Sequence, residues 1–202
     1  MSFLKSSTSF TRFRIKDPVP ATLWGEVVER LQKNAITDID ELPEERSVGW
    51  VAFENMLDTT FSEAPVEKGV YLAFSLRMDT RRVPPAVIKK YLAIALQKEE
   101  AANREMGKKF VSRERKKELK EQVILRLRMR FLPIPAEFQV IWNTATGIVF
   151  FASTQSKMVE TFQERFSRTF ELDLEPLTPY ELAASRLGDT AALDILEPTT
   201  FA

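Results

Sequence analysis

The chain of 202 residues contains neither cysteine nor histidine. Without cysteine there is no disulfide framework, and nothing indicates an oxidising compartment. Without histidine there is no Ser-His or Cys-His nucleophile and no histidine-ligated zinc or iron site. Any metal would need an all-oxygen site of the Mg²⁺ type, and acid–base chemistry would fall to carboxylates, lysine or tyrosine.

Long apolar segments are also missing. No apolar run approaches the roughly 20 residues needed to cross a bilayer. The N-terminal segment MSFLKSSTSF lacks the apolar centre of a secretory signal. Hydrophobic residues still make up 44% of the chain, which is enough for the core of one large domain or two small ones. We therefore expect a cytoplasmic globular protein.

The charged residues are segregated along the chain, although their total charge cancels. Residues 77–130 hold 17 Lys or Arg and seven Asp or Glu, a net charge of +10, and the remaining residues have a net charge of −10. A segment this basic attracts polyanions, and the release of counterions from nucleic-acid phosphates is a common use of it. The alternative is that long solvated helices are simply rich in Lys, Arg and Glu.

Hydrophobic periodicity predicts strands over residues 8–16 (with a bulge), 48–54, 69–78, 137–143, 147–152 and 170–177. It predicts helices over residues 23–34, 85–106 and 155–169, and two further helices that begin after Ser112 and after Thr178. Pro84-Pro85 suits the first turn of a helix, and Ser112 and Thr178 suit N-capping. Residues 125–131 alternate apolar and basic side chains with the period of a strand. We therefore expect the helix after Ser112 to end in an extended segment there.

This order predicts an α+β fold with two groups of mostly antiparallel strands flanking a long basic helical arm. The expected parts are an N-terminal α+β part (1–80), the basic helical arm (81–133), a hairpin-helix-strand part (134–187) and a tail (188–202).

The candidate DNA-binding residues are cations at the strand exit before Pro84 and along the two basic helices. They are Arg81, Arg82, Lys89, Lys90, Lys108, Lys109, Arg113, Lys116, Lys117, Lys120, Arg126, Arg128 and Arg130. The four residues 113, 116, 117 and 120 share one helix face. Cations in a row on a rigid support are what contact with a duplex backbone requires.

We expect this face to lie opposite the apolar face formed by Leu119, Val123 and Leu127. The alternative is a solvated helix whose three acids, at 114, 118 and 121, pair with neighbouring cations. Three acids cannot neutralise the eight basic residues of this helix, so the alternative is weakened.

Phe131 and Leu132 form an apolar pair between Arg130 and Pro133. Apolar surface costs roughly 25 cal/mol per Å² to leave in water. We therefore expect a homodimer whose contacts include both side chains. The alternative is that both pack beneath the hairpin over 138–152 of their own subunit.

Signatures of catalysis are missing. The sequence has no P-loop, GxGxxG, HxH or GxSxG motif. Glu118 and Lys120 are spaced as in a nuclease cluster, but they lie on a helix where charge pairing explains both. We expect a protein that is not an enzyme and needs no cofactor and no metal. A carboxylate-metal nuclease is the third alternative, after a protein-interaction or inhibitor module whose basic arm meets an acidic partner.

Several segments together resemble the RdgC family of bacterial recombination-associated proteins. Val83–Lys89 is similar to the family's Pro-x-x-Val-Ile-Lys helix start, and residues 108–123 are similar to its basic helix. The hairpin over 138–152 and the helix and strand over 153–177 follow in the family's order. Gly49-Trp50-Val51 and the strand Phe10–Arg14 also fit, so the resemblance covers residues 8–183.

The resemblance implies a non-sequence-specific protein that binds duplex DNA, with single-stranded DNA as a further ligand. It implies a ring-shaped homodimer with a positive central hole, in which the tip that corresponds to Phe131 and Leu132 meets its twofold mate. Such a protein is associated with the nucleoid, modulates homologous recombination by restraining RecA-like strand exchange, and needs no catalysis. Family members continue beyond the last matched helix, so we expect a short, C-terminally truncated member.

Overall fold

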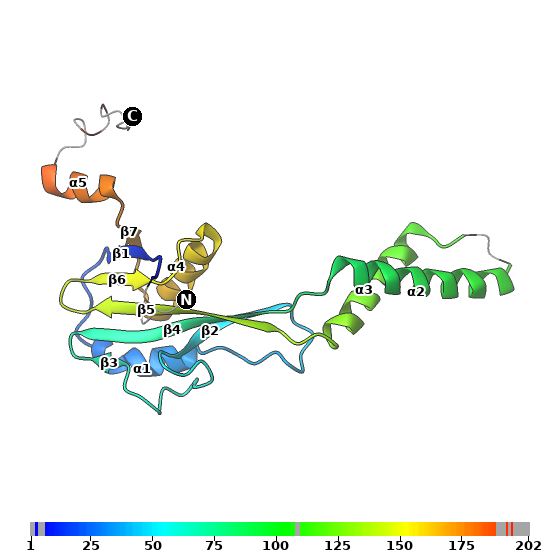
Figure 1. The fold of residues 1–202 in the computed structure, drawn as a ribbon, viewed down its shortest axis with the longest axis horizontal. Helices are drawn as coiled ribbons and strands as arrows, with labels where there is room; N and C mark the ends of the chain where they lie inside the picture. Colours follow the sequence, from blue (N-terminus) through cyan, green and yellow to red (C-terminus); the bar gives the residue numbers. More distant parts are fainter. Residues whose placement is uncertain (1–2, 4–6, 108–109, 189–192, 194, 196–202) are drawn as a thin grey trace. The chain divides into compact units, whose positions relative to one another are not determined.

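The computed structural model describes residues 3, 7–107, 110–188, 193 and 195. Within them it contains five helices and seven strands that form one sheet (Figure 1), which confirms the predicted α+β class. In chain order the elements are β1 (Thr11–Ile15), α1 (Leu23–Lys33), β2 (Arg46–Ala52), β3 (Glu67–Lys68), β4 (Tyr71–Thr80), α2 (Pro85–Glu105), α3 (Arg113–Arg128), β5 (Ile134–Asn143), β6 (Ile148–Phe151), α4 (Ser156–Phe170), β7 (Leu174–Pro176) and α5 (Pro179–Leu187). None of the described helices is both long and apolar enough to span a membrane.

The sheet joins the two groups of strands that the sequence separates. Its strand order is β2-β4-β5-β6-β1-β7, and β3 pairs with β4. The N-terminal strand β1 therefore lies between β6 and β7, antiparallel to both. Its register with β6 is continuous from Thr11 to Arg14, so the bulge expected in this strand is wrong, and Phe10 simply precedes the strand.

The sheet and α4 share an aromatic core. Phe162, Phe166 and Phe170 recur every fourth residue of α4, and all three are buried. The ring of Phe162 stacks on that of Phe151 with centroids 4.2 Å apart. The ring of Trp50 meets Phe162 edge-on at 6.3 Å. This arrangement accounts for the excess of phenylalanine over tyrosine, because most of these rings need no polar partner.

The chain divides into two compact units, each assembled from separate segments. Unit 1 comprises residues 1–35, 49–76 and 137–202, and unit 2 comprises residues 36–48 and 77–136. Helices α1, α4 and α5 belong to unit 1, and helices α2 and α3 belong to unit 2. The basic segment of the sequence, residues 77–130, therefore lies in unit 2, together with the acidic residues 36–48.

The start of α3 agrees with the sequence, but its end does not. The Ser112 side chain accepts a hydrogen bond from the backbone N–H of Arg115 at 3.1 Å, as an N-cap should. The helix then continues to Arg128, and the backbone N–H of Met129 still donates to Leu125. The extended segment expected over 125–131 is wrong. Leu, Arg and Met are good helix formers, and their alternation reflects side chains on opposite sides of a helix.

One buried hydrogen bond in unit 1 gives a stability prediction. The Trp50 indole N–H donates to Thr169 Oγ1 at 2.7 Å, and both residues are buried. Thr169→Val keeps the shape but leaves the indole N–H without an acceptor, so we expect the free energy of unfolding to fall by about 1–3 kcal/mol. Thr169→Ser retains the acceptor and should cost clearly less. Chemical denaturation of the three proteins checks this, and equal losses for Val and Ser would contradict it.

Candidate nucleic-acid interface

Helices α2 and α3 pack against each other along a single apolar seam. On α3 the buried residues are Leu119, Val123 and Leu127, which recur every fourth residue. Helix α2 is fully described, and none of its residues is buried. A pair of helices that buries so few residues leaves most of its other side chains exposed to solvent or to another molecule.

Arg115 of α3 forms an ion pair that links this helix to α2. Its guanidinium donates to both carboxylate oxygens of Glu99 on α2, at 2.7 and 3.2 Å. It also donates to Glu118 on its own helix at 2.9 Å. These hydrogen bonds raise the pKa of Arg115 above its usual value, and those to Glu99 make the largest contribution. Arg115 therefore stays charged and paired, which makes it a structural cation and not a free one.

The cations around this pair are exposed and unneutralised. Nine of the predicted DNA-binding residues are exposed: Arg82, Lys89, Lys90, Arg113, Lys116, Lys117, Lys120, Arg126 and Arg130. None of the nine forms an ion pair with another residue in the part of the chain that the structure describes. Of the three acids on α3 that were considered as neutralising partners, only Glu118 is paired there, and it is paired with Arg115. The surface charge of α3 is therefore available to a ligand.

The basic row on α3 does not lie where the sequence placed it. At about 100° per residue, positions 113, 116, 117 and 120 lie beside the buried face, not opposite it. Lys116 in fact lines a hollow with Glu100 and Arg104 of α2. The side opposite the buried face carries the acids 114, 118 and 121 together with Leu125. The row therefore follows the boundary between the two helices.

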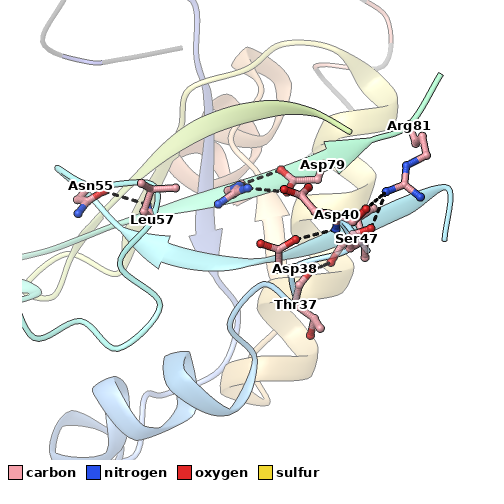
Figure 2. Close-up of polar contacts among 10 residues, drawn as sticks. Thr37, Asp38, Asp40, Ser47, Asn55, Leu57, Asp79 and Arg81 are labelled. Carbon is pink, nitrogen blue, oxygen red and sulfur yellow. Dashed lines mark hydrogen bonds and ion pairs between the residues drawn. The ribbon is translucent and has the colours of Figure 1, made fainter. Parts of the chain in front are cut away.

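Arg81 is a correction to the predicted set. It is 2% exposed, and its guanidinium donates to the backbone carbonyl oxygens of Ile39 at 2.6 Å, Asp40 at 3.0 Å and Leu42. Figure 2 shows this side chain directed at the segment that precedes β2. A guanidinium that is buried and whose two terminal nitrogens donate to these carbonyl oxygens cannot reach a phosphate. Arg81 holds a loop of unit 2 in place.

Three other residues that were predicted to bind DNA are not among the nine exposed cations. Arg128 is paired with Glu45, and its side chain is 29% exposed. Lys108 and Lys109 lie outside the described residues. Of the predicted DNA-binding residues, the nine exposed cations therefore remain as candidates.

The apolar tip is larger than the sequence indicated. Leu132 is 75% exposed, whereas Phe131 is only half-buried. Leu125 and Met129, at the C-terminal end of α3, are each 51% exposed.

Comparison with known proteins places the chain in a family. A family model described as "Putative exonuclease, RdgC" matches residues 8–189 of the 202. No curated protein matches the chain significantly. Within the described residues, no three or more His, Cys, Asp or Glu side chains gather where they could hold a metal ion.

The adjacent residues Arg81 and Arg82 have opposite exposure and give a paired prediction. Arg81→Ala removes the donor to the buried carbonyl oxygen of Ile39 and to the part-buried ones of Asp40 and Leu42, so we expect a loss of about 2–4 kcal/mol in the free energy of unfolding. Arg82→Ala should change this free energy by less than about 0.5 kcal/mol, because the side chain is exposed. Chemical denaturation measures both, and equal stability of the two variants would contradict the assignment.

Proposed function

The chain belongs to the RdgC family, and from this premise we propose that it binds duplex DNA without sequence preference and thereby modulates homologous recombination. The observation that carries the proposal is the set of nine exposed cations of unit 2, none of which is ion-paired with a described residue. Phosphate contacts release condensed counterions and provide an affinity that does not depend on base sequence.

The arrangement of these cations suits a phosphate backbone better than base edges. Lysines 116, 117 and 120 have long flexible side chains on one rigid helix, which suits the irregular spacing of phosphate oxygens. Nothing in unit 2 resembles a recognition helix with an Asn, Gln and Arg set for reading bases. We therefore expect affinity to vary little among duplexes of equal length, and single strands to bind through the same cations.

A protein that covers duplex phosphates in this way would compete with a RecA-like recombinase for the same DNA and so restrain strand exchange. Such competition needs abundance and non-specific affinity, but no catalysis and no cofactor. A location at the nucleoid in the cytoplasm is part of the same proposal.

We further propose that the protein acts as a homodimer, in a ring-shaped arrangement with the basic helices facing the space between subunits. The exposed apolar side chains Leu125, Met129 and Leu132 support an interface that includes Phe131 and Leu132. Their solvation is costly, and pairing across a twofold axis would remove it.

The family description also supports a second candidate, an exonuclease. This activity would need carboxylates to hold Mg²⁺ near the scissile phosphate. Incubation of end-labelled duplex with the protein and Mg²⁺ separates the two functions, because a binding protein shifts the DNA and leaves its length unchanged.

The central test of DNA binding reverses the charge of the row on α3. Changing Lys116, Lys117 and Lys120 together to Glu should abolish duplex binding and leave the fold intact, since all three are exposed. The matched control makes the same change in net charge on unit 1, at Lys16, Lys33 and Lys157, which are also exposed. Gel-shift titration in low salt measures the affinity. An unchanged affinity of the α3 variant, or an equal loss in the control, would contradict the proposed interface.

The dimer proposal has a separate test. We expect Phe131→Ser with Leu132→Ser to give a folded, soluble monomer, because the change removes apolar area from the proposed interface only. Sedimentation of the wild-type protein and the variant reports the association state, and circular dichroism reports the fold. A folded dimer of unchanged stability would exclude these residues from the interface. An unfolded or aggregated variant would show that they belong to the core of their own subunit.

A further inference from the structure

A groove runs between α2 and α3, entirely within unit 2. It encloses about 320 Å³. Its apolar lining comes from Ile94 and Ala95 on α2 and from Leu119, Val123 and Leu127 on α3. The lining positions on α3 extend from Leu119 to Leu127, and Arg130 lies just beyond the end of the helix. The helical part is about 12 Å long at roughly 1.5 Å per residue, a length that about four residues of extended chain would cover.

The rim of the groove is cationic. Lys98, Arg126 and Arg130 line it, and none of the three forms an ion pair with a described residue. The only lining acid is Glu99, and its carboxylate is engaged by Arg115 at 2.7 Å. The groove therefore combines an apolar floor with unneutralised positive charge at its edge.

This combination selects one class of occupant. A nucleic-acid backbone satisfies the cations but has no apolar group of the size needed to fill the floor. A second copy of unit 2 would bring net positive charge against the rim, because residues 36–48 and 77–136 together have a net charge of +6. A peptide that alternates carboxylates with large apolar side chains satisfies both the floor and the rim, in the manner of apolar anchors in helix grooves.

We propose that the groove between α2 and α3 binds an acidic peptide segment of a partner protein, with one or two large apolar side chains on the floor and carboxylates on Lys98, Arg126 and Arg130. Arg126 and Arg130 belong both to this site and to the proposed DNA surface, so peptide binding is measured in the absence of DNA. The half-exposed Ile94, at 39%, offers apolar contact to an incoming side chain.

The test uses a fluorescein-labelled peptide of sequence Asp-Asp-Leu-Asp-Phe-Asp-Asp-Ile-Asp, measured by fluorescence anisotropy against the full chain. A second peptide replaces its three apolar residues with serine. Ala95→Phe fills the groove without a change of charge, and Ala93→Phe, at an exposed position of α2 outside the groove, is its control. Lys98→Glu reverses one rim charge, and Arg104→Glu, on α2 outside the groove, is its control.

We expect the serine peptide, Ala95→Phe and Lys98→Glu each to weaken binding at least tenfold, and both controls to stay within about twofold of the wild-type protein. Ala95→Phe should leave duplex DNA affinity unchanged, so a failure of this site is distinguishable from a failure of DNA binding. Equal binding of the serine peptide would show only electrostatic adsorption, and would overturn the proposal. A wild-type dimer that Ala95→Phe dissociates, without peptide binding, would assign the groove to a second copy and also overturn it. Should Ala95→Phe not fold, Lys98→Glu against Arg104→Glu decides.

Discussion

The packing of α3 on α2 along one seam is the constraint on which the candidate interface depends. Because Leu119, Val123 and Leu127 are the buried residues of α3 and no residue of α2 is buried, the pair has little apolar burial to stabilise it. The bidentate contact between Arg115 and Glu99 adds a fixed polar link across the seam. Most side chains outside the seam are exposed, and this is why so many cations remain available on so few residues.

Much of the fold follows from local sequence signals. The helix over 23–34, the double proline before α2 and the N-caps at Ser112 and Thr178 are all found in the structure, because caps and first-turn prolines act within a few residues. The pairing of β1 with both β6 and β7 could not be predicted in the same way. It joins segments more than a hundred residues apart, and alternation along a strand does not specify its neighbours.

The candidate site was predictable in composition but not in detail. A count of charges locates the basic segment, yet Arg81 and Arg82 are indistinguishable in sequence. Only the carbonyl groups of residues 39–42 show that the first is a buried structural residue and the second an exposed one. The structural role of Arg115 could not be predicted from the sequence either, because its partner Glu99 lies on another helix. Residues 125–131 were misread because alternation of apolar and basic side chains is compatible with the two sides of a helix end.

The central claim, that exposed cations of unit 2 bind duplex phosphates without reading bases, is tested most directly by the salt dependence of duplex affinity. Each phosphate contact contributes a slope of about −0.9 to a plot of log K against log salt concentration. With nine exposed cations available, the account predicts a slope of about −4 or steeper, the same for duplexes of unrelated sequence. A slope near zero, or a slope and affinity that change strongly with sequence, would contradict it.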